Sequence, residues 1–266
     1  MKIGFIGGGN MAEAILAAVL RRNLASPGDI IISDIDTGKR SVLAQKYQVQ
    51  AVSDNLAAIG ERDIVILAVK PQVLTEVMTG LQGRLKPGQL VLSIIAGKSI
   101  QTIATGLGHD CIVRSMPNTP AQIGEGMTVW TATPRVTPRQ KRWSSSILGV
   151  MGAEIYVDTE KYLDMATAVS GSGPAYVFLF VESMTDAAVN LGFTPEMARK
   201  LVLQTLLGSA HLLQQSGRSP QELRHMVTSP GGTTAAAITA FEKGGFPALV
   251  SQAVRAAHER ARQLGS

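Results

Sequence analysis

The segment that most constrains the fold is the first one, Lys2–Leu16. Its apolar run Ile3-Gly4-Phe5-Ile6 is typical of a buried parallel strand, and the small-residue spacing Gly7-x-Gly9-x-x-Ala12 follows directly. In such a spacing the first glycine permits a tight turn, the second lets backbone N–H groups approach a pyrophosphate, and the third small residue lets a helix pack on its strand. The positive end of that helix favours phosphate. The segment therefore predicts a strand, a glycine turn and a helix that bind a dinucleotide.

Later runs of apolar and β-branched residues predict further strands. They cover residues 29–34, 63–69, 89–97, 111–114 and 154–157, and a helix opened by Thr137-Pro138 is expected over 137–151. The run Asp63–Val69 is apolar on both faces, as a central parallel strand should be. Strands that alternate with helices predict an α/β fold, here a Rossmann-type domain with a mostly parallel sheet.

The strand-like runs of the sequence stop before Glu160, and from that residue onward only helical periodicity is found. Glycine and proline turns interrupt it at residues 170–174, 192–195, 217–220 and 229–232. We predict a dinucleotide-binding Rossmann domain over residues 1–158 and an all-α domain, for dimerisation and substrate binding, over 159–266. The helices expected at 176–191 and 197–213 have more apolar surface than one small helical domain can cover, which predicts at least a dimer.

Composition argues against several other classes of protein. The net charge of +5 comes from scattered Lys and Arg residues without runs, so no nucleic-acid partner is expected. Cys111 is the single cysteine, which excludes an intrachain disulfide and favours a reducing, cytoplasmic location. Glycines interrupt the apolar segment after Lys2, and glycine and proline interrupt 165–181, so neither a signal peptide nor a membrane span is expected. The four histidines lack metal-ligand spacing, and Ser170–Gly173 lacks the pattern of a nucleophile elbow.

The end of the second predicted strand should meet the adenosine ribose of the cofactor. Asp34 can bond a ribose diol, which selects NAD. Alternatively Ser33 occupies the selecting position, with Lys39 and Arg40 one or two helical turns later, which admits the 2′-phosphate of NADP. An ordinary helix cap also explains these residues.

Three later loops follow predicted strands at the edge where α/β sheets bind ligands. Lys70-Pro71 follows the central strand, and Ala96-Gly97 gives the next strand a small-residue exit that leaves room for a ring. Two prolines fix the loop around Asn118, which offers a polar group there, although a rigid turn alone would explain that loop equally well.

In the helical half, Thr228–Thr234 precedes an Ala-rich helix expected to begin near Ala235. Free N–H groups at a helix start bind anions, so a substrate carboxylate fits there beside the hydroxyls of Thr233 and Thr234. An ordinary N-cap is the alternative, but Gly231-Gly232 exceeds what capping requires.

Several separate stretches together resemble the pyrroline-5-carboxylate reductase family over the whole chain. Arg224-His225 departs from the Lys-Asp pair expected in that family, which changes the charge near the site entrance. The matching stretches are Gly4–Met11, Ala68–Pro71, Met116–Pro120, Ser170–Tyr176, Pro220–Leu223 and Val227–Thr234, continuing to Phe241-Glu242.

The resemblance implies hydride transfer from NADPH, with NAD also accepted, to the cyclic imine 1-pyrroline-5-carboxylate, which gives L-proline. It also implies a homodimer with interleaved helical domains and shared active sites, assembled into a larger oligomer. Thr234 is the expected catalytic residue. The expected substrate-binding residues are Ser229, Gly231, Gly232, Thr233, Asn118 and Lys70; the expected cofactor-binding residues are Gly7, Gly9, Asn10, Met11, Ser33, Asn55, Ala68, Val69, Lys70, Pro71, Ala96 and Gly97.

Three alternatives remain at this point. Another imine reductase would share these features. A β-hydroxyacid dehydrogenase would need a lysine base on the first long helix of the helical domain, yet between residues 160 and 190 the sole lysine is Lys161. A non-catalytic NADP-sensing protein would not need Gly231–Thr234.

Overall fold

The computed structural model describes residues 1–265, which form two compact units. Unit 1 comprises Met1–Ser172 together with the residues from Ala257 onward, and unit 2 comprises Gly173–Ala256. This division lies beyond the predicted boundary at 158/159 because α7 (Lys161–Ala166) and the π-helical turn η4 (Thr167–Gly171) contact the sheet of unit 1.

The described part of unit 1 contains one sheet of eight strands in the order β3-β2-β1-β4-β5-β6-β7-β8. Neighbouring strands run parallel except β6 and β7. Only the five-residue helix η3 (Thr119–Ile123) interrupts the short connection between these two strands, whereas a parallel pair needs a crossover of a dozen residues or more. The strands are β1 (Ile3–Ile6), β2 (Ile30–Ser33), β3 (Gln50–Val52), β4 (Ile64–Leu67), β5 (Leu90–Ser93), β6 (Ile112–Met116), β7 (Gly126–Ala132) and β8 (Gly152–Tyr156).

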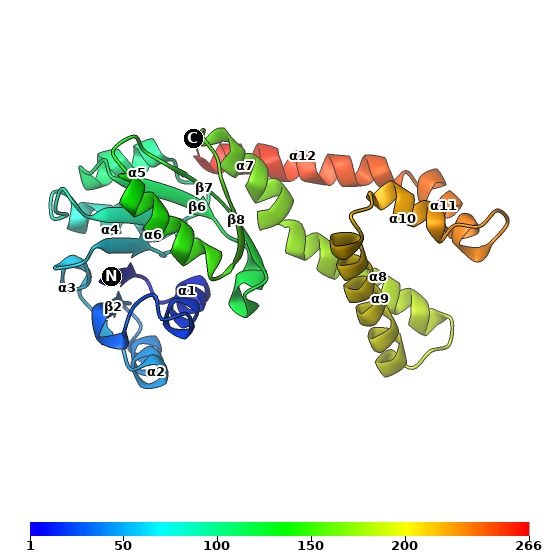
Figure 1. Ribbon diagram of the computed structural model, residues 1–266, viewed down its shortest axis with the longest axis horizontal. Helices are drawn as coiled ribbons and strands as arrows, with labels where there is room; N and C mark the ends of the chain where they lie inside the picture. The colour runs from blue at the N-terminus through cyan, green and yellow to red at the C-terminus, as the bar shows by residue number, and fades with distance from the viewer. Residues whose placement is uncertain (266) are drawn as a thin grey trace. The chain divides into compact units, whose positions relative to one another are not determined.

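Helices cover both faces of this sheet (Figure 1). Each face carries its own cluster of buried side chains, and β4 is buried along its whole length, as predicted for a central strand. On one face lie α1 (Asn10–Arg21), α2 (Thr37–Tyr47) and α6 (Pro138–Gly149); on the other lie α3 (Asn55–Ile59), α4 (Leu74–Leu81) and α5 (Ile100–Leu107). The short helices η1 (Pro27–Asp29) and η2 (Pro71–Val73) connect elements.

The predicted strands and the helix over 137–151 are confirmed within a few residues, with Thr137 as N-cap of α6. The strands β3 and β7 were missed. β3 is a three-residue edge strand, and β7 follows a glycine and proline loop that predicted only a turn.

Unit 2 is helical, as predicted. Its first helices are separated by the predicted glycine and proline turns, whereas the turn at Gly244-Gly245, between α11 and α12, was missed. They are α8 (Gly173–Asn190), α9 (Pro195–Ser216), α10 (Pro220–Met226), α11 (Thr233–Lys243) and α12 (Phe246–Gly265), of which the last continues into unit 1.

Candidate active site

The glycine turn between β1 and α1 is built as the spacing predicts. Gly7 has φ +98°, and a Cβ there would lie 2.9 Å from the carbonyl oxygen of Ala68, so the close strand β4 leaves room for glycine alone. Ala12 is buried where α1 packs on the sheet. Gly9 is the N-cap of α1, and a Cβ built on it would meet nothing within 4 Å. The free space beside Gly9 therefore lies at the start of a helix, where a pyrophosphate fits.

Asp34 holds this turn in place. Its Oδ2 accepts the Gly8 N–H at 2.8 Å and its Oδ1 accepts the Asp36 N–H at 2.9 Å, so both carboxylate oxygens bind backbone. Arg40 donates from Nη1 to the Asp34 carbonyl at 2.7 Å and to the Ile35 carbonyl at 3.0 Å. The loop after β2 thus has a fixed carboxylate and a positive charge beside it.

Ser33, predicted to contact the cofactor, is fully buried at the end of β2. Its hydroxyl donates to Oδ1 of Asn55 at 2.6 Å and lies 3.2 Å from the Phe5 carbonyl oxygen. Asn55 itself is half-buried at the first turn of α3. The side chain of Ser33 therefore orients the Asn55 amide from inside unit 1 and does not reach the surface itself.

The loops after β4 and β5 lie at the same edge of the sheet as the glycine turn, because these strands run parallel to β1. Ala68 and Val69 are half-buried, Lys70 is exposed, and Pro71 opens η2. Gly97 has φ +66°, and a Cβ on it would come within 2.8 Å of Leu264 Cβ. The strand order reverses between β1 and β4, and at such a point open α/β sheets bind ligands.

The structure therefore brings the segments that carry the predicted cofactor residues to one edge of unit 1, with the side chain of Ser33 buried beneath that edge. Asn10 and Met11 belong there too, as the first residues of α1.

Asn118 fixes two segments of unit 1 against each other. Its Nδ2 donates to the Ser170 carbonyl at 3.0 Å, and its Oδ1 accepts the Met127 N–H at 2.9 Å. A Cβ on Gly171 would lie 2.9 Å from Met116 Cε, so the turn η4 packs tightly on the loop that carries Asn118. The side chain predicted to bind substrate thus also anchors its own loop.

The second group of predicted residues lies in unit 2, at the start of α11. The helix begins at Thr233, two residues earlier than predicted, because Gly232 in an extended conformation serves as its N-cap. No side chain caps it, so the hydroxyls of Thr233 and Thr234 are not cap groups. Gly231 has φ +71°, and a Cβ on Gly232 would lie 2.5 Å from Ser229 Oγ. The two glycines therefore fold the backbone tightly before a helix whose first N–H groups are free to bind an anion.

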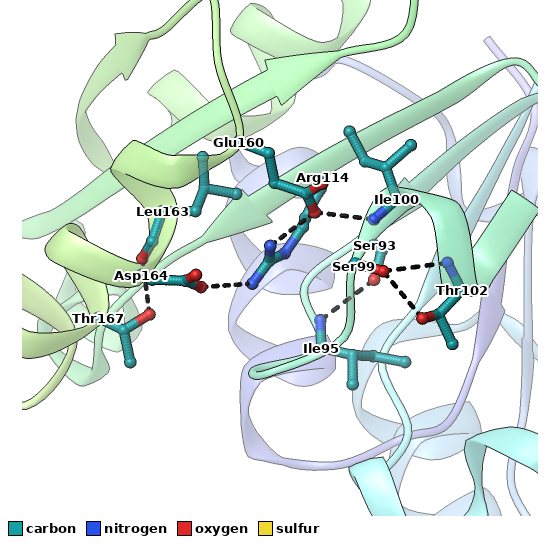
Figure 2. A network of polar contacts seen from close by, with 10 residues as sticks. All are labelled: Ser93, Ile95, Ser99, Ile100, Thr102, Arg114, Glu160, Leu163, Asp164 and Thr167. Atoms are coloured by element: carbon teal, nitrogen blue, oxygen red, sulfur yellow. Dashed lines mark hydrogen bonds and ion pairs between the residues drawn. The ribbon is translucent and has the colours of Figure 1, made fainter. Parts of the chain in front are cut away.

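Sequence reasoning missed a cluster of charges beside the β5–α5 loop, shown in Figure 2. Arg114 on β6 pairs with Glu160 and Asp164, from the start of α7. An arginine directly after the apolar strand residues Ile112 and Val113 was the available sign, because a buried charge requires a partner.

The described part of the chain offers neither an activated cysteine nucleophile nor a metal site. Burial raises the pKa of the Cys111 thiol above its usual value, so the thiol stays protonated and is a poor nucleophile. Among the described residues no group of three or more His, Cys, Asp or Glu could hold a metal ion. The helices described here are all too short or too polar to cross a membrane.

Two family models match this chain, one in each of its two parts. The family model for pyrroline-5-carboxylate reductase dimerisation matches residues 160–264, and the model for NADP oxidoreductase, coenzyme F420-dependent, matches residues 2–97. The pyrroline-5-carboxylate reductase of Synechocystis sp. is 42% identical over 265 residues, which cover 100% of this chain and 98% of the relative. The Escherichia coli enzyme of that name is 38% identical, covering 99% and 98%.

Solved structures agree with these sequence matches. A pyrroline-5-carboxylate reductase from Coxiella burnetii superposes with a TM-score of 0.89 at 36% identity, covering 100% of this chain and 98% of that one. The Plasmodium falciparum pyrroline carboxylate reductase, solved with NADP bound, gives a TM-score of 0.90 at 32% identity with the same coverage. Prephenate dehydrogenase from A. aeolicus, at 16% identity and a TM-score of 0.55, shares the fold alone.

Proposed function

The chain belongs to the pyrroline-5-carboxylate reductase family, and we propose which of its residues carry out each part of that reaction. The enzyme transfers a hydride from a nicotinamide cofactor to the C=N carbon of 1-pyrroline-5-carboxylate, which gives L-proline, the last step of proline biosynthesis. The observation that carries this assignment is the similarity over the full chain, at 42% identity to the Synechocystis relative. A dehydrogenase that needs a lysine base on its first long helix is disfavoured, because α8 contains no lysine.

Unit 1 holds the cofactor in this proposal. The space beside Gly9 and the first N–H groups of α1 suit the pyrophosphate. The nicotinamide ring is placed beside the loop of Ala96 and Gly97, because this loop follows β5 at the edge where the strand order reverses, although Leu264 fills the space directly beside Gly97. When bound, the cofactor supplies the hydride, so the protein chiefly has to position and polarise the substrate.

We propose that NADPH is the preferred cofactor. Both carboxylate oxygens of Asp34 already accept backbone N–H groups, which leaves the carboxylate poorly placed to bond a ribose diol. Asn55, oriented by Ser33, offers an amide, while Lys39 is exposed and Arg40 is half-buried in the first turns of α2. These groups favour a 2′-phosphate over a free hydroxyl.

The test is an assay with 1-pyrroline-5-carboxylate, in which absorbance at the nicotinamide band is followed with each cofactor. We expect kcat/KM for NADPH to exceed that for NADH by about ten- to a hundredfold, since a hydrogen bond to a charged group contributes about 1.5–3 kcal/mol. Lys39→Ala should lower the value for NADPH and leave that for NADH unchanged. A ratio that favours NADH would show that Asp34 releases the glycine turn and binds the ribose.

Unit 2 supplies the substrate groups in this proposal. The free N–H groups at the start of α11, around Gly232 and Thr233, bind the substrate carboxylate, and the tight turn through Ser229 and Gly231 shapes that site. The Thr234 hydroxyl hydrogen-bonds the ring nitrogen, which changes from imine to amine as the hydride arrives. The C=N carbon is already an electrophile toward hydride, so the reaction requires no protein nucleophile, and the Thr234 hydroxyl passes on the proton that completes the amine.

We also propose that two residues of unit 1 act on the substrate. Lys70 is exposed after β4, where its charge attracts the carboxylate of the substrate. Asn118 has the more indirect role of fixing its loop through Ser170 and Met127.

We propose a homodimer formed through unit 2, further assembled into a larger oligomer, in a reducing compartment such as the cytoplasm. None of the 18 residues of α8 is buried, and Phe178 and Leu179 are 65% and 63% exposed. Apolar surface of this extent usually belongs to an interface. We also keep residue 159 as the start of the dimerisation domain, which the match of the dimerisation model from residue 160 supports.

Light scattering at micromolar concentration should therefore give at least twice the mass of one chain. Phe178→Glu should shift the protein toward monomer, because it places a charge in the apolar interface. Val42→Glu, at a position 56% exposed on α2 of unit 1, is the matched control and should leave the mass unchanged. Hydrogen exchange should map the protection lost on dissociation to residues after 158. A wild-type protein that is monomeric and fully active would contradict the proposed dimer. The proposed cytoplasmic location is tested separately, by fractionation of cells.

A further inference from the structure

The charge cluster beside the β5–α5 loop has a buried arginine at its centre. The side chain of Arg114 is 4% exposed. Its Nη1 lies 2.6 Å from Glu160 Oε1, and its Nη2 lies 3.3 Å from Asp164 Oδ1. An arginine so buried is stable only when carboxylates pair with it, so these two residues fix the start of α7 on β6.

Glu160 also binds the start of α5, whereas the carboxylate of Asp164 makes no hydrogen bond to that helix among the described residues. Oε1 of Glu160 accepts the backbone N–H of Ile100, the first residue of α5, at 2.7 Å (Figure 2). That N–H is one of the groups left free at a helix start, where a carboxylate is also favoured by the helix dipole. One oxygen of Glu160 thus joins Arg114 to the end of the loop Ile94–Ser99.

The beginning of the same loop is also tied to β6. Ile95 donates its N–H to Ser93 Oγ at 3.3 Å, and Ser115 donates its hydroxyl to the Ser93 carbonyl at 3.1 Å. Ser115 is fully buried and directly follows Arg114 on β6. Two adjacent residues of β6 therefore act on the two ends of the loop, Ser115 through Ser93 and Arg114 through Glu160.

We infer that Glu160, held by Arg114, is a positioning residue that fixes the loop Ile94–Ser99 so that the nicotinamide lies at the correct distance for hydride transfer. The inference rests on the proposed function, in which Ala96 and Gly97 of this loop lie beside the nicotinamide ring. The cluster itself touches neither substrate nor cofactor in this account. Its loss should therefore slow the hydride transfer step and leave the binding of the adenosine end of the cofactor unchanged.

The experiment compares Glu160→Ala with Asp164→Ala, which removes the other carboxylate from the same guanidinium. Single-turnover oxidation of NADPH by 1-pyrroline-5-carboxylate reports hydride transfer, and the affinity for 2′-phospho-ADP-ribose reports the adenosine end. We expect Glu160→Ala to slow hydride transfer by about ten- to a hundredfold, because a displacement of about 1 Å can cost that much. Asp164→Ala should slow hydride transfer by less than about threefold, which is close to the usual scatter between the effects of independent substitutions. Both variants should keep the affinity for the fragment, and Glu160→Gln should recover most of the rate, since its amide oxygen can still accept the Ile100 N–H.

A second pair keeps the inference testable if Glu160→Ala fails to fold. Ile100→Pro deletes the N–H that Glu160 accepts but leaves the ion pairs intact, and Ile100→Ala is its control. Proline suits the first position of a helix, and Ser99 before it has ψ 156°, which proline accepts. Ile100→Pro should slow hydride transfer more than Ile100→Ala does.

Equal rates of hydride transfer in Glu160→Ala and Asp164→Ala, or in Ile100→Pro and Ile100→Ala, would overturn the inference. So would a Glu160→Ala variant that loses as much affinity for 2′-phospho-ADP-ribose as it loses in rate. If the wild-type protein does not oxidise NADPH with this substrate at all, the proposed function fails instead, so the two failures are distinguishable.

Discussion

Replacing Thr234 by alanine is expected to lower kcat by about 10²–10⁴-fold, the usual loss when a proton-transferring group is removed. In the proposed mechanism the hydroxyl hydrogen-bonds the ring nitrogen while that atom changes from imine to amine, so its loss is expected to affect the chemical step. Stability should change little. Because Gly232 caps α11 and Thr234 is already the second residue of the helix, the substitution removes no cap. Alanine also has the higher helix propensity, which offsets small losses of contact.

Thr233→Ala is the matched control for this prediction. Thr233 is adjacent, also lies in the first turn of α11, and is expected to contribute mainly its backbone N–H to the carboxylate. Its substitution should lower kcat far less than that of Thr234. If Thr234→Ala keeps a near-normal kcat but melts several degrees lower, the hydroxyl has only a structural role, and the proton must come from solvent or from the substrate's iminium form.

The second large effect is expected at the glycine turn, where Gly7 and Gly9 should respond in different ways. Gly9→Leu places a side chain in the free space at the start of α1, so it should raise KM for NADPH about a hundredfold or more, equivalent to losing two hydrogen bonds to a charged phosphate. The backbone of Gly9, at φ −74° and ψ 176°, suits any residue. The melting temperature should therefore stay within a few degrees of the wild type.

Gly7→Ala should instead destabilise the fold. Its φ of +98° is strained for alanine, and the new Cβ would lie 2.9 Å from the Ala68 carbonyl oxygen, which together should cost at least about 1–3 kcal/mol. Thermal melting and calorimetric titration with NADP⁺ measure both effects. A Gly9→Leu variant that binds NADP⁺ normally would contradict the placement of the pyrophosphate beside Gly9.

The sequence predicts the elements whose signals are local. The glycine turn was predictable because its spacing encodes a turn, a close approach and a helix packing contact within six residues. The strand β7 was missed although its residues Met127–Thr131 favour a strand, because the glycine and proline loop before it was interpreted as a turn alone. Its antiparallel direction depends on the short connection after β6. The start of α11 was placed two residues late, since an extended glycine serves as the cap in place of a side chain.

The candidate site was predictable to a similar degree. The cofactor residues follow parallel strands, whose ends meet at one edge of the sheet, so their grouping could be inferred. The roles of individual side chains could not, because they depend on partners far away in the chain. Asp34 binds Gly8, 26 residues earlier, and Arg114 binds Glu160, 46 residues later. Neither pairing follows from periodicity or motif spacing.

Every residue role proposed above depends on the transfer of a hydride from the nicotinamide to the C=N carbon of 1-pyrroline-5-carboxylate. The most direct test uses NADPH with deuterium at both C4 positions of the nicotinamide and analyses the proline formed by mass spectrometry and NMR. We expect L-proline with one deuterium, on the ring carbon that is bonded to nitrogen and does not carry the carboxylate. Unlabelled proline, or labelled NADPH left unconsumed in the presence of the imine, would contradict this hydride transfer.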